Sequence, residues 1–144
     1  MSDGIGPTPS LPAVTEPVLD IYLSLLMEQI AADDRNHVPV TLTMSSGVVY
    51  GELISHGAWK AEWARALQGG RGNGVDLMVD FPESVDGARA ALVASGELED
   101  VHHLPRWVHL REVTIAGVGH GPISMPFWRG RLGDVAGWSV GRPA

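Results

Sequence analysis

The chain has 144 residues and a mass of 15.4 kDa, which suits one ordinary domain and excludes a multidomain enzyme. Hydrophobic residues make up 44% and charged residues 19%, the composition of a folded globular protein rather than of a disordered or membrane-embedded one. The sequence contains no cysteine, so disulfides, cysteine-based zinc sites, iron–sulfur clusters and thiol nucleophiles are excluded.

The charge is negative overall and unevenly distributed. The formal net charge of −7 disfavours a protein that mainly coats nucleic acid, because lysine and arginine dominate affinity for phosphates. Residues 1–105 carry 15 acidic and 5 basic side chains, whereas residues 106–144 carry 2 acidic side chains and 5 arginines. An acidic body is therefore followed by a basic C-terminal segment.

The N-terminal part predicts an arm followed by a helix. Residues 1–14 are rich in Gly, Pro and Ser and have neither the basic residues nor the apolar run of a secretory signal, which predicts a disordered arm and a cytoplasmic protein. Thr15 is a plausible N-cap, with an acid and a proline in the first turn. An apolar stripe indicates that the helix packs on a sheet; its main side comprises Val18, Tyr22, Leu25, Leu26 and Gln29, flanked by Leu19, Leu23 and Ile30.

Residues 38–55 are typical of a β-hairpin. Apolar and polar residues alternate over 38–44, Ser45 to Gly47 form the turn, and residues 48–55 are again rich in β-branched side chains. Gly51 lies inside the second strand and predicts a bulge or sharp bend that lets a small sheet curl.

Residues 56–104 are predicted to form a helical, glycine-containing insertion. Residues 58–67 have the spacing of an amphipathic helix whose Trp59 and Trp63 share one face, more consistent with burial than with an exposed patch. Residues 68–74 form a glycine-rich connector, and residues 75–81 fit either a short strand or a helical turn. Residues 82–96 look helical and end at a glycine.

The C-terminal part predicts three more strands, over residues 106–115, 127–132 and 138–141. Residues 116–126 are expected to form a surface loop and residues 133–137 a turn. The fold class is therefore α+β: one domain over residues 15–144, with a small curled antiparallel sheet or partly open barrel of the Sm-like or SH3-like kind. The N-terminal helix precedes the sheet, and the helical insertion lies between strands two and three.

The sequence offers no reaction centre. His102, His103, His109 and His120 lack the spacing of metal ligands, and the glycine-rich stretch lacks the lysine and hydroxyl of a phosphate-binding loop. No serine lies in a nucleophile elbow, and the acidic residues of 80–100 are typical of a solvated surface. We therefore expect no enzymatic activity, no catalytic residues, no cofactor and no metal.

Residues 127–141 form the candidate interaction surface. Trp128, Arg129, Arg131 and Trp138 combine large apolar area with bidentate donors, residue types enriched at interface hot spots. In the alternative arrangement the two tryptophans fill the core of a small barrel while the two arginines point outward.

The hairpin, the strand around 108–110 and the closing segment together resemble the gas vesicle accessory proteins of the U type, the GvpU family. The matching positions are Leu42, Gly47, Gly51, Leu53, Ile54 and Ser55 in the hairpin, Val108, His109 and Leu110 in the strand, and Trp128, Arg129, Gly130, Val135, Gly137 and Gly141 at the end. The resemblance implies a non-enzymatic cytoplasmic protein that associates with gas vesicles and influences their clustering or assembly. Its implied partners are the vesicle shell, other gas vesicle accessory proteins and further copies of itself.

A second hypothesis belongs to a different class. An Sm-like or OB-like module could bind RNA or single-stranded DNA with an arginine- and tryptophan-rich C-terminal face. The negative net charge counts against this alternative, and such binding must weaken steeply with salt.

Overall fold

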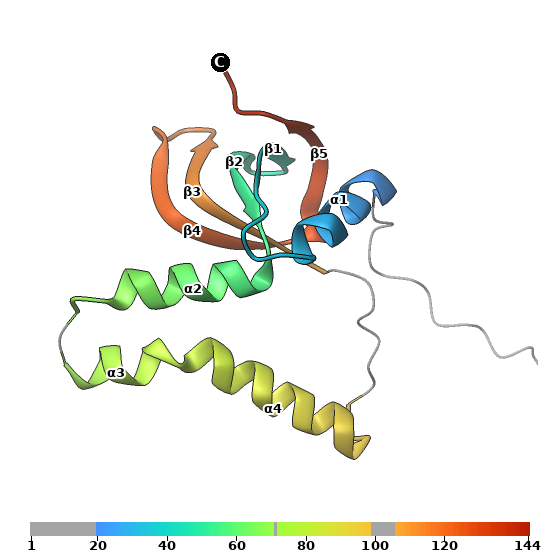
Figure 1. Ribbon diagram of the computed structural model, residues 1–144. Helices are drawn as coiled ribbons and strands as arrows, with labels where there is room; N and C mark the ends of the chain where they lie inside the picture. Colours follow the sequence, from blue (N-terminus) through green and yellow to red (C-terminus); the bar gives the residue numbers. More distant parts are fainter. Residues whose placement is uncertain (1–19, 71, 99–105) are drawn as a thin grey trace, which may run out of the picture.

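The structure is a computed structural model that describes residues 20–70, 72–98 and 106–144 (Figure 1). The predicted arm over residues 1–14, the predicted N-cap Thr15, and His102 and His103 lie outside these residues. The described elements in chain order are α1 (Ile21–Ala31), β1 (Val38–Met44), β2 (Gly47–Ile54), α2 (His56–Leu67), α3 (Asn73–Val79), α4 (Phe81–Ser95), β3 (Trp107–Gly117), β4 (Ile123–Arg131), a 3-10 turn (Leu132–Asp134) and β5 (Val135–Val140).

The five strands form one antiparallel sheet in the order β4-β3-β2-β1-β5. Strands β1 to β4 are neighbours in both sequence and space, and β5 returns to pair with β1. The sheet is not closed, because β4 and β5 are its two edges. The predicted α+β class, with an open curled sheet, an N-terminal helix and a helical insertion between strands two and three, is confirmed.

Helix α1 covers one face of the sheet with only part of the predicted apolar stripe, since Leu23, Leu26 and Ile30 of that stripe pack in the core. Its buried residues are Leu23, Met27 and Ile30, whereas Tyr22 and Leu25 are exposed. The helix is apolar on more than one side, so sequence spacing alone did not select the buried face. The described N-cap is Asp20, whose carboxylate accepts a hydrogen bond from the Tyr22 N–H group.

The predicted hairpin is confirmed, and so is the irregularity at Gly51. Tyr50 pairs with Thr114 and Glu52 pairs with Arg111, so β3 has one residue more than β2 at this point. Glu112 in the bulge has a φ of 51°, in the left-handed region. A Cβ added at Gly51 would lie 2.8 Å from the Arg111 carbonyl oxygen, so the bulge requires glycine on the facing strand.

Side chains on the two faces of the sheet form two separate clusters. The main core joins α1 to one face and contains Leu23, Met27, Ile30, Val40, Leu42, Val49, Leu53, Val108, Leu110, Val113 and Leu132. The second cluster joins α2 to the other face and is built around Ile54 and Trp59. Trp59 is 8% exposed, and Trp63 is half-buried and packs beside it. The predicted inward orientation of this tryptophan pair is therefore confirmed.

The described part of the insertion contains three helices. Helix α2 begins at His56 rather than at Ala58, because the Ser55 hydroxyl accepts a hydrogen bond from the Ala58 N–H group and caps it. The ambiguous stretch after the glycine-rich connector is helical, as α3. Helix α4 ends at Gly96 with a φ of 80°, as its sequence predicts. Figure 1 shows α2 directly against the sheet, with α3 and α4 lying beyond it.

Two boundaries near the C-terminus were predicted wrongly. Strand β4 begins at Ile123, so residues 123–126 of the expected loop belong to the sheet. Pro126 is tolerated there because β4 is an edge strand, where a missing N–H group need not break the ladder. Strand β5 begins at Val135, within the segment expected to be a turn. In the described ranges, no helix has the length and apolar character needed to cross a bilayer.

Replacing Gly51 with alanine tests the bulge. The added methyl group would meet the backbone of β3, so Gly51→Ala is expected to lower the free energy of unfolding by about 1 to 3 kcal/mol in urea titrations. Gly137→Ala is the matched control, because its nearest neighbour is the Cβ of Thr43 at 4.0 Å. Equal stability of the two variants would contradict the proposed close approach.

Candidate functional site

The four predicted interaction residues lie on the two edge strands. Arg129 and Arg131 are exposed on β4, and Trp128, which precedes them, is half-buried against the main core. Trp138 lies on β5, packs against the same core, and donates a hydrogen bond from Nε1 to a carboxylate oxygen of Asp20 at 2.8 Å. The structure thus brings the first three residues together on one edge and places the fourth on the other edge.

An unpredicted tryptophan lies beside the arginine pair. Trp107 begins β3, is 41% exposed, and pairs in register with Arg131. The guanidinium carbon of Arg129 lies 4.3 Å from the centroid of the Trp107 ring and 5.8 Å from that of Trp59. The first distance is typical of a cation–π contact. We call Trp107, Arg129 and Arg131 the β4 surface.

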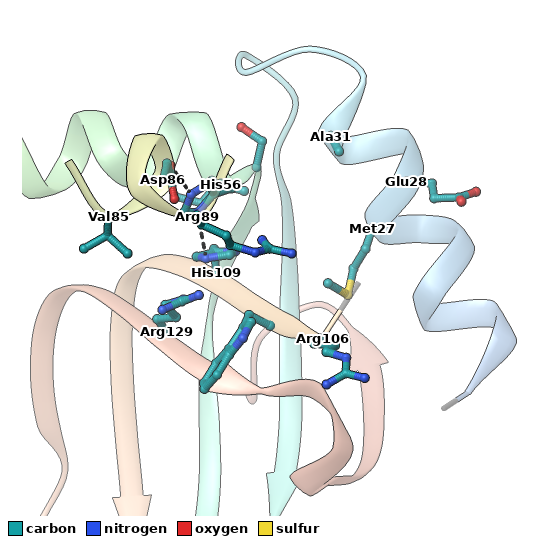
Figure 2. A pocket seen from close by; sticks show the side chains of 13 residues that line it. Met27, Glu28, Ala31, His56, Val85, Asp86, Arg89, Arg106, His109 and Arg129 are labelled. Atoms are coloured by element: carbon teal, nitrogen blue, oxygen red, sulfur yellow. Dashed lines mark hydrogen bonds and ion pairs between the residues drawn. The ribbon is translucent and has the colours of Figure 1, made fainter. Parts of the chain in front are cut away.

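Next to this surface, a pocket of about 530 Å³ opens between α1, α4 and the sheet (Figure 2). Its walls come from α1, the junction of β2 with α2, α4, and the neighbouring parts of β3 and β4. Its volume lies in the range of small-molecule sites. We call it the α1–α4 pocket.

A chain of hydrogen bonds crosses one wall of the pocket. His56 Nδ1 lies 3.2 Å from His109 Nε2, and His56 Nε2 lies 2.9 Å from a carboxylate oxygen of Asp86. Lys60 forms ion pairs with Asp86 at 3.1 Å and with Glu83. The two histidines and the aspartate come from α2, β3 and α4, so this chain ties α4 to the sheet.

The environment fixes the charge of these groups. Burial lowers the pKa of His109 to about 3, assisted by the nearby charges of His56 and Arg129, so His109 is neutral at physiological pH. Burial disfavours the ionised form of Asp86, but hydrogen bonds from His56 and Lys60 outweigh this effect and lower the pKa of that carboxyl group.

The hydroxyl group in the pocket lining is already engaged by its neighbours. The hydroxyl of Ser55 lines the pocket, but it donates to an Asp34 carboxylate oxygen at 2.6 Å and accepts from Ala58, so no histidine is placed to activate it. Within the part of the chain that the structure describes, no three histidine or acidic side chains are grouped to hold a metal ion.

Sequence reasoning treated His109 as an ordinary strand residue and left His56 and Asp86 without a role. Strand alternation did contain a signal, because it places His109 on the opposite face from Val108 and Leu110. That face is the one that α2 covers. The pairing with His56 and Asp86 depends on how α4 folds back, which no local pattern encodes.

The described residues form an open five-stranded α+β sheet that packs on an N-terminal helix, with a pocket beside it. Residues 20–143 match the family described as Gas vesicle protein GvpU-like, and the chain belongs to this family. The predicted resemblance is confirmed, and the protein is a gas vesicle accessory protein. Comparison with curated proteins and with solved structures gave no match.

The neutral state of His109 predicts a pH effect on stability. The unfolded chain binds a proton at this histidine below pH 6.5, whereas the folded protein does so only near pH 3. Stability is therefore lost as the pH falls through this window, with a slope from this group of about 1.4 kcal/mol per pH unit. In denaturant titrations from pH 7 to pH 4, His109→Gln is expected to show a shallower loss than the wild type.

The control for this experiment is His120→Gln, since His120 is exposed and outside the pocket. This variant should follow the wild-type pH dependence. If His109→Gln and His120→Gln showed the same slope, the desolvation of His109 would not be the cause.

Proposed function

We propose that this gas vesicle accessory protein associates with gas vesicles and influences their clustering or assembly through protein–protein contacts, without catalysing a reaction. Family membership supports the gas vesicle context. The β4 surface is the observation that supports direct contact with a protein partner. The proposed location is the cytoplasm, on the vesicles themselves.

The β4 surface has the composition of a protein interface. Arg129 and Arg131 are exposed, and no carboxylate among the described residues lies within 4.0 Å of either guanidinium group. Trp107 supplies an exposed aromatic face next to them. Tryptophan and arginine are the residue types most enriched at interface hot spots, and unpaired guanidinium groups select acidic partners.

The outer side chains of β4 extend this surface. Ile123 and Met125 are 44% and 40% exposed on the same edge strand. Strand β4 therefore carries exposed apolar side chains near its first residue and two arginines near its last. In protein interfaces, apolar burial supplies affinity and charge supplies orientation. The proposed partner is the vesicle shell or another accessory protein of the vesicle.

Self-association is the second part of the proposal. The basic residues of the β4 surface belong to the C-terminal segment, while 15 of the 17 acidic residues lie within residues 1–105. Opposite charges on different parts of one molecule favour head-to-tail contacts between copies. Such contacts provide a route by which a vesicle-bound protein brings vesicles together.

Charge reversal on β4 tests direct association. The double variant Arg129→Glu and Arg131→Glu is expected to reduce co-flotation with purified gas vesicles by about tenfold or more, because the side chains are exposed and replaced by repelling groups. Circular dichroism checks that the fold is retained.

The matched control is the double variant Arg35→Glu and Arg65→Glu, which makes the same change in net charge at two exposed arginines away from β4. This control should float like the wild type. Loss of flotation in both double variants would indicate a general charge effect, and retention in both would exclude the β4 surface.

Salt dependence tests self-association. If copies attract through opposite charges, the average mass measured by sedimentation should fall toward that of the monomer as salt is raised, because the Debye length shortens to about 3 Å at 1 M. The β4 double variant should remain smaller than the wild type at low salt. If the wild type had the mass of a monomer at every salt concentration, self-association would be contradicted. Binding of added RNA at low salt would instead favour the nucleic-acid alternative.

A further inference from the structure

The α1–α4 pocket concentrates positive charge in an acidic protein. Three of the ten basic residues of the chain line it: Arg89 from α4, Arg106 at the start of β3, and Arg129 from β4. The net charge of the whole chain is −7. These three arginines lie on segments far apart in sequence, so the fold itself assembles the positive wall.

Asp86 and Glu28 are the acidic residues that line the pocket, and neither forms an ion pair with Arg89 or Arg129. The carboxylate of Asp86 is already held by His56 and Lys60. Glu28 lies on α1, and Figure 2 shows its side chain pointing away from Arg89 and Arg129. Neither of these two arginines has a carboxylate within 4.0 Å among the residues that the structure describes.

Arg89 and Arg129 are close enough to repel each other. Burial lowers the pKa of the Arg129 guanidinium, and the positive charge of Arg89 lowers it further, against the opposing charge of Asp86. An anion placed between the two guanidinium groups would reduce this repulsion and accept hydrogen bonds from both. Guanidinium groups bind planar and tetrahedral oxyanions in this way, often through two parallel bonds.

The pocket also has an apolar part. Met27, Ile54 and Val85 contribute aliphatic surface, and Trp107 contributes an aromatic ring. A site of about 530 Å³ that combines apolar surface with convergent polar groups is typical of small-molecule binding. The ligand that fits this lining has one oxyanion group and an apolar body.

We propose that the α1–α4 pocket binds a small molecule that carries a phosphate or carboxylate group. The oxyanion lies between Arg89 and Arg129, and the apolar part lies against Trp107, Met27 and Val85. The pocket shares Arg129 and Trp107 with the β4 surface, but Arg89 belongs only to the pocket and Arg131 only to the β4 surface, so variants at these two arginines separate the two proposals.

Three probes test the ligand chemistry: phenyl phosphate, inorganic phosphate and benzoate. Each is titrated into the isotope-labelled full chain while the indole N–H signals are followed by NMR, with Trp107→Phe assigning the Trp107 signal. Phenyl phosphate is expected to shift this signal saturably and to bind at least about tenfold more tightly than inorganic phosphate, since burial of a phenyl ring adds affinity. Benzoate distinguishes a carboxylate from a phosphate as the preferred group.

Variants locate the site. Arg89→Gln and Arg129→Gln are each expected to weaken binding of the better aromatic probe by about tenfold, because each removes a charged hydrogen-bond donor. Arg131→Gln, on the same strand as Arg129 but outside the pocket, should bind like the wild type. No saturable shift with any probe, or unchanged binding in both pocket variants, would overturn the proposal.

Vesicle flotation separates the two proposals. Arg89→Gln should lose probe binding and keep flotation, whereas Arg131→Glu should keep probe binding and weaken flotation. If Arg89→Gln still bound the probe normally, the anion would not be held as proposed, whatever the flotation result.

Discussion

The hydroxyl group of Ser55 is the contact on which the rest of the site depends. It is 5% exposed, accepts the Ala58 N–H bond that starts α2, and donates to Asp34 in the loop after α1. Gly57 leaves room for this arrangement, since a Cβ there would lie 2.6 Å from the Asp34 carboxylate. One hydroxyl therefore fixes where the sheet ends, where α2 begins and how the loop after α1 approaches both.

That junction sets the positions of His56 and Trp59 on α2. His56 is the first residue of the helix, so its ring faces His109 and Asp86 rather than continuing the strand. Trp59 lies one turn later and packs between the ring of His109 and Phe127. Because the aromatic cluster is fixed in this way, the cationic side chain of Arg129 reaches the ring of Trp107 at the mouth of the pocket.

Local patterns in the sequence predicted most of the sheet but little of the pocket. The period-2 alternation of β1 and the glycine of β2 predicted the hairpin and its bulge, because both depend on neighbouring residues. The apolar stripe predicted for α1 was only partly correct: Leu23 and Ile30 are buried, but Tyr22 and Leu25 are exposed, because helical spacing alone does not select which side of a broad stripe faces the sheet. The histidine–aspartate chain was missed because its members are 30 and 53 residues apart and meet only through tertiary packing. The predicted arginine pair on β4 did prove exposed, as strand alternation indicates.

Helix α4 is attached to the rest of the protein mainly through polar contacts. Most of its residues are exposed, and Pro82 is its buried one, so hydrogen bonds and ion pairs to His56 and Lys60 hold it more than apolar burial does. Elements of this kind open locally at a lower free-energy cost than the sheet beneath them. The wall of the pocket formed by α4, which carries Arg89, therefore opens more easily than the sheet. A ligand bound to this wall stabilises the closed position of the helix by its binding free energy.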